Sequence, residues 1–395
     1  MGSEWRKTTL GEVLTLQRGF DLPETDRRAG RFPVIASTGQ VGTHYKPMVR
    51  GPGVVIGRSG SLGGGQFIKG DFWPLNTTLW VKDFKGNNPR FCYYLLKSLD
   101  FSHFNVGSGV PTLNRNHIHP LPVVVPSDQN EQRAIAHILG TLDDKIELNR
   151  RMNQTLEEMA RALFKSWFVD FDPVRAKATV RREHPDWSNA QVSRAACPTL
   201  KPEIAELFPD EFENSELGEI PKGWRVSRLG DIADVNWGDT NVTKSSYVNE
   251  GYLAYSAKGP DGFLSYYDYD CVGVVVSAIG ANSGFTWLAR GKWSCIKNTI
   301  RFWSIVSDIS TEYLYFATHG NNIWPLRGSA QPFISQTDAQ NLRVLHPSNG
   351  LARKFGDTIS PLFDRIDFSI HESRTLAALR DTLLPKLISG VLRVK

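Results

Sequence analysis

Long apolar runs and clustered cysteines are both missing from this chain of 395 residues. No run of 18 or more apolar residues occurs, so we expect no membrane-spanning helix. The first residues lack the basic-then-apolar pattern of a secretory signal. The cysteines lie far apart without C-x-x-C spacing, which argues against a disulfide scaffold and a cysteine zinc site and favours a reducing, cytoplasmic location; they are Cys92, Cys197, Cys271 and Cys295.

Motifs for covalent chemistry are missing as well. The sequence contains no G-x-x-x-x-G-K-[ST] loop, no G-x-G-x-x-G after a strand, no H-E-x-x-H and no G-x-S-x-G. The run Asn88-Pro89-Arg90-Phe91 is not the Asn/Asp-Pro-Pro-aromatic motif of adenine methyltransferases. A nuclease-like D-x-K pattern spans 143–145, and His117 and His119 have no partner at metal-ligand spacing. We therefore expect no catalytic residue and no metal site in this chain.

The sequence instead contains a long internal repeat, and repeats of this kind determine the architecture. Equivalent residues recur at an offset of 219 to 221 positions along most of the chain. The D-x-K pattern is lost in the second copy, where 364–366 reads Asp-Arg-Ile, which argues against a nuclease. The matching positions are Trp5/Trp224, Leu10/Leu229, Val54/Val274, Gly60/Gly280, Trp73/Trp293, Gly107/Gly328, Pro111/Pro332, Leu121/Leu342 and Asp144/Asp364. A duplicated fold whose copies share no role is the alternative to a shared function.

Each copy starts with a mixed segment and ends with a helical one. Short β-branched runs between Gly, Asn and Pro predict strands at 53–56, 79–81 and 123–125. Short helices are predicted at 91–99 and 311–319. Residues 131–168 contain no proline and only one glycine, and their apolar residues recur every three or four positions, which predicts one long amphipathic helix.

The apolar stripes of the two long helices should pack against each other. A helix of about 38 residues is about 57 Å long at about 1.5 Å per residue, which is too long for one small domain to cover. The buried Asn149 on the stripe can fix the register, while Pro385 is expected to kink or end the second helix. The predicted packing residues are Ile135, Leu139, Leu142, Ile146, Leu156, Leu163, Ile359, Ile366, Ile370 and Leu383.

The predicted fold class is α+β, with two mixed α/β domains separated by two long antiparallel helices. The helices form a coiled-coil-like spacer, and the repeat implies a pseudo-two-fold axis. The expected boundaries are 1–128 for globule 1, 129–170 for the central helix, 171–215 for a connector, 216–347 for globule 2 and 348–395 for the C-terminal helix. The proline-containing connector shows little periodicity, with at most a turn of helix at 203–208.

The two globules differ in charge. Globule 1 carries 15 Lys and Arg against 9 Asp and Glu, a net charge of +6, whereas globule 2 carries 11 against 12, a net charge of −1. A basic globule fits a polyanionic partner such as DNA. The near-neutral globule 2 does not, so the charge of the chain as a whole does not establish DNA binding.

Four segments carry a resemblance to a known family. They are LDDKIELNR at 142–150, LFKSWF at 163–168, GEIPKGW at 218–224 and LPKLISG at 384–390. With the repeated arrangement of globule and helix, they closely resemble the specificity subunit of Type I restriction-modification systems, over essentially the whole chain. The interiors of the globules carry no such signal, as expected if each reads a different sequence.

The resemblance implies a non-catalytic DNA-binding subunit. Each globule would be a target recognition domain that reads one half of a split, asymmetric site in double-stranded DNA, and the helices would set the gap. Two methylation subunits would dock to give an adenine methyltransferase, and restriction subunits would complete an ATP-dependent nuclease. No cofactor is expected in this chain; S-adenosylmethionine, ATP and Mg would bind only to partner subunits. The alternative is a stand-alone, sequence-specific DNA-binding regulator.

Residues that contact DNA should lie in loops and carry hydrogen-bond donors for phosphates and base edges. Basic and polar residues next to Gly and Pro meet this requirement in both globules, although each could equally be a solvated surface residue. In globule 1 we select Arg27, Arg28, Arg31, Arg58, Ser59, Ser61, Ser108, Asn114 and Arg115. In globule 2 we select Lys244, Lys258, Asn282, Lys297, Asn298, Arg327, Ser329 and Gln331.

Overall fold

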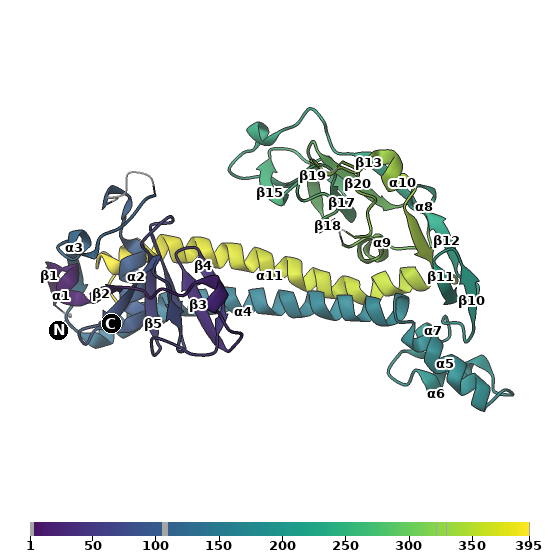
Figure 1. Cartoon of the computed structure of the whole chain (residues 1–395), viewed down its shortest axis with the longest axis horizontal. Helices are drawn as coiled ribbons and strands as arrows, with labels where there is room; N and C mark the ends of the chain where they lie inside the picture. Colours follow the sequence, from purple (N-terminus) through teal and green to yellow (C-terminus); the bar gives the residue numbers. More distant parts are fainter. Residues whose placement is uncertain (1–3, 105–109, 321, 329, 395) are drawn as a thin grey trace. The chain divides into compact units, whose positions relative to one another are not determined.

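The computed structural model describes residues 4–104, 110–320, 322–328 and 330–394. The chain divides into two compact units: unit 1 comprises Met1–Arg151 with Phe368–Lys395, and unit 2 comprises Met152–Asp367 (Figure 1). Each unit contains one globule and parts of both long helices. No helix in these described ranges is both long and apolar enough to cross a membrane.

The globular part of unit 1 is a mixed α/β structure built on three small sheets. A four-stranded sheet has the order β2-β8-β5-β6, a three-stranded sheet has the order β4-β3-β7, and β1 pairs with β9. The elements are β1 (Trp5–Thr9), α1 (Leu10–Val13), β2 (Thr15–Arg18), η1 (Glu24–Asp26), β3 (Phe32–Ala36), β4 (Gly39–His44), β5 (Gly53–Gly57), β6 (Gly63–Ile68), β7 (Trp73–Pro74), β8 (Thr78–Asp83), α2 (Pro89–Ser98), η2 (Ser102–Phe104), α3 (Arg115–Ile118) and β9 (Pro122–Pro126).

The short apolar runs form the strands that the sequence predicts. The run at 53–56 lies in β5, which is buried along its whole length between β8 and β6. Helix α2 begins at Pro89, where the Asn88 side chain accepts a hydrogen bond from the Phe91 backbone at 3.0 Å. Proline at the first helical position loses no hydrogen bond, and the Asn side chain satisfies a free N–H. The buried face of α2 covers this sheet.

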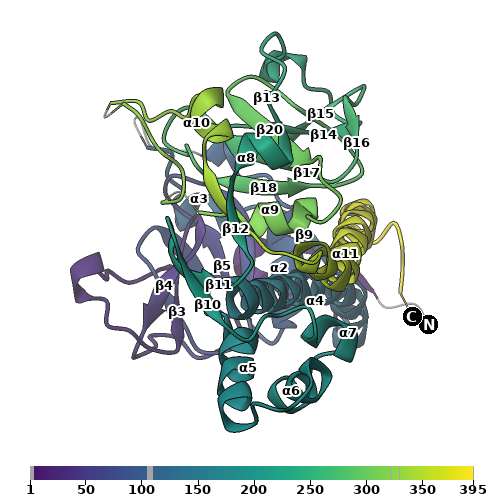
Figure 2. The ribbon, with the colours of Figure 1, turned by 90° about the vertical axis from the view of Figure 1, so that its right-hand side faces the viewer.

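The globular part of unit 2 has the same order of strands in its main sheet. Strands β13-β20-β17-β18 lie side by side with α9 against them (Figure 2). A second sheet has the order β15-β14-β19-β16, β12 pairs with β21, and β10 pairs with β11. The elements are β10 (Phe212–Ser215), β11 (Gly218–Pro221), β12 (Arg225–Arg228), α8 (Leu229–Ile232), β13 (Ala233–Trp237), η3 (Lys244–Ser246), β14 (Tyr252–Ser256), β15 (Gly259–Leu264), β16 (Tyr269–Asp270), β17 (Gly273–Ser277), β18 (Thr286–Ala289), β19 (Lys292–Cys295), β20 (Thr299–Ser304), α9 (Thr311–Ala317), α10 (Gln336–Gln340) and β21 (Arg343–His346).

Equivalent hydrogen bonds hold the repeated positions in both units. The Leu10 N–H donates to Leu121 O at 2.8 Å, and Leu229 N–H donates to Leu342 O at 2.8 Å. The repeated prolines are also held alike, because Pro111 O accepts from Gly60 N–H and Pro332 O accepts from Gly280 N–H, both at 2.9 Å. The matching sequence positions therefore support a common framework within each unit.

Two long helices, α4 (Gln129–Phe168) and α11 (Leu351–Ile388), confirm the helical prediction. In unit 1 their segments run antiparallel, because Asp143 pairs with Arg380 while Asn149 bonds to 369–373. The Asn149 amide donates to Ser369 O, Glu372 Oε2 and Ser373 Oγ, so this buried residue fixes the pairing of the two helices there.

In unit 2 the helical segments share an aromatic core. The Phe355 ring of α11 lies within 5.9 Å, centroid to centroid, of Phe164, Trp167 and Phe168 on α4 and of Phe316 on α9. Most predicted packing residues are buried or half-buried, in unit 1 Ile135, Leu139, Leu142, Ile146 and Leu383, and in unit 2 Leu156, Leu163, Ile359 and Ile366. Ile370 departs from the prediction because its side chain is 41% exposed.

The structure differs from the prediction in the connector, and α11 does not end at Pro385, where a kink or an end was expected. The connector contains three helices, α5 (Asp172–Glu183), α6 (Asn189–Ala196) and α7 (Pro202–Ala205), rather than a single turn at 203–208. The fully buried Lys177 of α5 holds them together, because its Nζ donates to Asn189 Oδ1 at 2.9 Å and to Ala205 O at 3.2 Å. Helix α11 continues past the exposed Pro385 to Ile388, one turn beyond the predicted break, and Gly390 follows with a φ of +75°.

Candidate nucleic-acid interface

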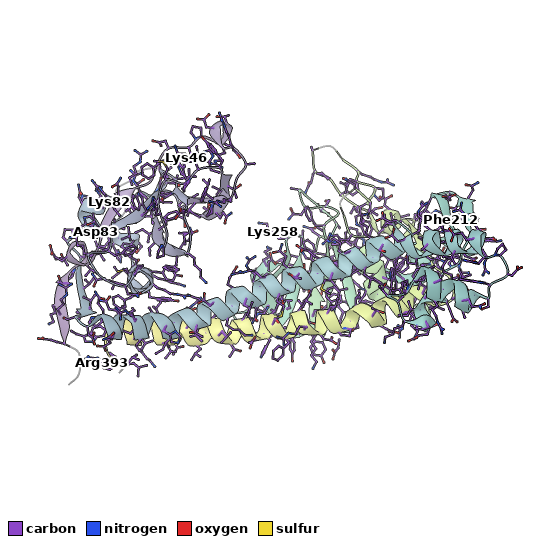
Figure 3. The ribbon with its side chains drawn as sticks, turned by 90° about the horizontal axis from the view of Figure 1, so that it is seen from below. Lys46, Lys82, Asp83, Phe212, Lys258 and Arg393 are labelled. Carbon is purple, nitrogen blue, oxygen red and sulfur yellow. The ribbon has the colours of Figure 1, made fainter. Side chains whose placement is uncertain are left out.

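A basic groove in globule 1 brings together three of the predicted residues, Arg58, Asn114 and Arg115. The groove has a volume of about 710 Å³ and lies between β2, β8 and the segment that leads into α3. Two further cations, Arg18 and Lys82, line it (Lys82 is labelled in Figure 3). We call Arg18, Arg58, Lys82 and Arg115 the groove cations.

Backbone hydrogen bonds hold the walls of the groove in place. Arg58 directly follows the buried strand β5, and its N–H donates to Thr77 O at 2.9 Å while its carbonyl accepts from Leu113 N–H at 2.8 Å. Asn114 caps α3, because its side chain accepts a hydrogen bond from the Asn116 backbone at 3.0 Å. The hydrogen bond between Leu113 and Arg58 thus brings Arg58 and Arg115 to one groove, although they are 57 positions apart in the sequence.

The groove cations carry little compensating charge. Arg18 contacts Asp21 at 3.2 Å, and both side chains are more than half exposed, so this ion pair is weak. The Arg58 and Arg115 guanidinium groups donate to backbone carbonyls at 3.4 Å. In the part of the chain that the structure describes, no carboxylate forms an ion pair with Arg58, Lys82 or Arg115. The groove therefore presents guanidinium and ammonium donors suited to phosphate and base-edge acceptors.

His119, beside this groove, is held in its neutral form. Its Nε2 accepts a hydrogen bond from the Leu16 N–H at 3.1 Å, which requires an unprotonated nitrogen. Burial lowers the pKa of His119, and the nearby charges of Arg115 and Lys85 lower it further. The histidine is a structural acceptor, in agreement with the absence of a metal-ligand pattern around it.

The other predicted residues of globule 1 lie outside the groove lining. Arg27, Arg28 and Arg31 gather beside the β3–β4 hairpin, where Arg28 lies 5.9 Å from the centre of the Tyr45 ring and Arg31 lies 4.9 Å from that of Phe32. Ser59 pairs with Thr112 next to the groove, and Ser61 is exposed in the following loop. Ser108 lies outside the described residues.

The predicted residues of globule 2 do not form an equivalent cluster of free cations. Lys244 pairs with Asp261, and Arg327 pairs with Asp338. Ser329 lies outside the described residues. The remaining predicted residues lie in exposed or half-buried loop positions; they are Lys258, Asn282, Lys297, Asn298 and Gln331.

Sequence reasoning missed Arg18 and Lys82. Both lie in or at the end of strands, whereas we searched loops bounded by Gly and Pro. Strand β2 pairs with β8, with Arg18 opposite Leu79, and this register places both cations at one groove. A charged residue near the end of a strand was the available signal, but the pairing of β2 with β8 could not be identified from the sequence.

The D-x-K pattern at 143–145 links helix α4 to globule 1. We call the interactions of Asp144 with Lys69 and Arg90 the brace. Asp144 on α4 accepts hydrogen bonds from Lys69 at 3.0 Å and from Arg90 at 2.7 Å, and both donors belong to globule 1. In unit 2 the equivalent Asp364 on α11 accepts from Arg290 at 2.6 Å. Neighbouring Asp143 accepts from the Tyr94 hydroxyl at 2.6 Å. These carboxylates serve packing, which explains why the D-x-K pattern need not recur.

The brace predicts an acid-dependent loss of stability. The hydrogen bond from Arg90 and that from Lys69 lower the pKa of Asp144 from 3.8 to about 2. A lowered pKa in the folded state adds stability that is present above the unfolded pKa and is lost as the pH falls from about 4 towards 2. Asp144→Asn should therefore flatten this part of the stability profile in urea titrations, whereas the exposed Glu250→Gln should not. An unchanged slope in Asp144→Asn would contradict the brace.

Metal binding gains no support from the arrangement of side chains. Among the described residues, no group of three or more His, Cys, Asp and Glu side chains could hold a metal ion. Burial raises the pKa of the thiols Cys92 and Cys295 to about 12, so neither is a reactive thiolate. The groove cations remain the strongest functional feature of the globules.

Comparison with known proteins identifies similar sequences and a similar fold. The family model described as Type I restriction modification DNA specificity domain matches residues 2–158. The Type I restriction enzyme MjaIX specificity subunit of Methanocaldococcus jannaschii is 24% identical over 332 residues, covering 78% of this chain and 69% of that protein. The HindI specificity subunit of Haemophilus influenzae is 27% identical over 358 residues, covering 76% of this chain and 77% of that protein.

The fold agrees with a solved structure at low sequence identity. The crystal structure of a Type I restriction-modification system S subunit from M. genitalium superposes with a TM-score of 0.62 at 18% identity, covering 98% of this chain and 96% of that chain. The similarity shows a shared fold. The resemblance predicted from the sequence is therefore confirmed by the matching domain and by the two relatives.

Proposed function

We propose that this chain, a specificity subunit of the Type I restriction-modification class, reads a two-part site in double-stranded DNA for partner enzymes. Globule 1 would read one half of the site and globule 2 the other. Each mismatched base pair costs about 1–3 kcal/mol of binding free energy, and two linked readers add their discrimination. The chain itself would perform no covalent chemistry and would act in the cytoplasm with the DNA.

The observation that carries this proposal is a common framework with different groove residues. Main-chain hydrogen bonds at Gly60 and Gly280 and the order of strands are the same in the two globules. The side chains at the groove positions differ between the globules. Arg58 and Arg115 of globule 1 correspond to Ala278 and Gln336 of globule 2. A shared scaffold with different side chains at equivalent positions is what two readers of different sequences require.

The helices fit the role of a spacer that also receives partner subunits. Several large apolar side chains on α4 and α11 are 41–58% exposed; in unit 1 they are Leu148, Phe368, Ile370 and Leu379, and in unit 2 Met159 is 54% exposed. Apolar side chains that stay exposed on these helices would gain free energy from burial against a partner protein. We assign them to two methylation subunits, and we assign S-adenosylmethionine, ATP and Mg to the methylation and restriction subunits.

Reconstitution separates this function from that of a stand-alone regulator. The chain and methylation subunits encoded beside it are mixed with S-adenosylmethionine and a library of random duplexes, and the methylated sequences are read. We expect adenine methylation in a split motif only when all subunits are present. If the chain alone binds one duplex with full affinity and added methylation subunits leave all DNA unmethylated, the regulator is the correct interpretation.

A further inference from the structure

The repeat allows the basic groove of globule 1 to be compared with its equivalent in globule 2. In globule 2 the Ala278 carbonyl accepts from Ile334 N–H at 2.8 Å, the same bond that Arg58 makes with Leu113. Strand β13 pairs with β20 as β2 pairs with β8 at one end, since Trp237 lies opposite Ile300 as Arg18 lies opposite Leu79. A register shift between Thr15 and Leu16 occurs only in the β2–β8 pair. The positions that correspond to the groove cations are Trp237, Ala278, Trp303 and Gln336.

None of these four positions in globule 2 carries a positive charge. The Ala278 side chain is fully buried. The Gln336 amide donates to Val235 O at 3.0 Å and to Asn236 Oδ1 at 3.2 Å, so it serves the framework. Trp303 lies under the Arg301 guanidinium at 4.1 Å from the ring centre, and that guanidinium pairs with Asp234. The equivalent of the basic groove is therefore neutral.

Several other cations of globule 2 are paired with carboxylates and are therefore less available to phosphates. The pairs are Lys244–Asp261, Arg290–Asp364, Arg301–Asp234, Arg327–Asp338 and Arg343–Glu216. In globule 1, three groove cations have no such partner among the described residues. Counterion release on DNA binding requires cations that are free to neutralise phosphates, and globule 1 offers more of them.

We propose that the groove cations bind phosphates of the DNA backbone and that globule 1 thereby supplies most of the salt-dependent affinity of the chain. This inference rests on the proposed function and adds an asymmetry to it. Globule 2 would contribute mainly through neutral hydrogen bonds and apolar contacts. The two half-sites would then be read by similar scaffolds. Globule 1 would contribute more electrostatic binding free energy than globule 2.

The test measures binding of the full chain to a mixed-sequence duplex of about 40 base pairs by fluorescence anisotropy over a series of KCl concentrations. The test variant is Arg58→Gln/Lys82→Gln/Arg115→Gln. The logarithm of affinity falls with the logarithm of salt by about 0.9 per neutralised phosphate. The slope of the variant should therefore be shallower than that of the original chain by about 3.

Two controls make the outcome specific. Lys7→Gln/Lys46→Gln/Arg50→Gln removes the same charge from exposed positions of globule 1 outside the groove, and Lys258→Gln/Lys297→Gln removes exposed cations from globule 2. Both should keep nearly the original slope. If either control changes the slope per removed charge as much as the groove variant does, the inference is overturned while DNA binding stands. If the original chain shows no salt-dependent binding either alone or together with its methylation subunits, the proposed function fails as well.

Discussion

Deleting one helical turn from both long helices of unit 1 is expected to shorten the gap in the methylated DNA motif by about two base pairs. The deletion removes residues 145–148 from α4 and 372–375 from α11. Four helical residues span about 6 Å at about 1.5 Å each, and base pairs are spaced about 3.4 Å apart. The measurement is methylome sequencing of cells that carry the altered chain with its methylation subunits.

The choice of residues keeps the helix pair intact on both sides of the deletion. Lys145 and Glu372 pair with each other at 3.2 Å, so both partners leave together. The ion pair between Asp143 and Arg380 stays, as does the brace at Asp144. The Asn149 side chain loses two of its contacts but keeps the Ser369 carbonyl as an acceptor.

A matched control separates length from composition. Replacing the same eight residues by alanine removes the same side chains but keeps the length of both helices. This control should methylate the original motif with its original gap. A deletion variant that still methylates the original gap would rule out the helices as the spacer, because then their length would not determine the distance between half-sites.

Phe355→Ala should give the largest loss of stability of any single substitution considered for unit 2. The side chain is fully buried, and aromatic rings from α4 and α9 surround it. Removing a buried phenylalanine side chain costs about 3–5 kcal/mol, through lost burial and the cavity that remains. Urea unfolding of the full chain would be monitored by tryptophan fluorescence. The loss in free energy of unfolding would be measured from the transition in which the fluorescence of Trp167 changes.

Phe368 on the same helix supplies the control, because its side chain is 56% exposed. Phe368→Ala should change the free energy of unfolding by less than about 1 kcal/mol, as is usual for surface substitutions. Equal losses for the two variants would show that the aromatic cluster does not hold α4 and α11 together in unit 2.

The sequence predicted the elements that local pattern determines. The spacing of apolar residues along 131–168 was sufficient for α4, and the run at 53–56 was sufficient for β5. The repeat predicted which positions of the two globules are equivalent, and hydrogen bonds at Gly60 and Gly280 agree with it. These features could be predicted because neighbouring residues, or a duplicated copy, carry the necessary information.

Features that depend on distant contacts could not be predicted. The helices α5 to α7 are stabilised by Lys177, whose acceptors lie 12 to 31 residues away, and the sequence around them shows little periodicity. Pro385 does not end α11, because the following turn packs Leu387 and Ile388 into the core of unit 1. Lys82 joined the candidate site only when the pairing of β2 with β8 was known.

Exchanging globule 2 tests most directly whether the two globules read separate halves of one site. Residues 216–347 are replaced by the corresponding segment of another specificity subunit, and the methylome is sequenced with the same methylation subunits. We expect one half of the methylated motif to change while the other half and the gap stay as they were. A motif that stays entirely unchanged, or one in which both halves change, would contradict this expectation.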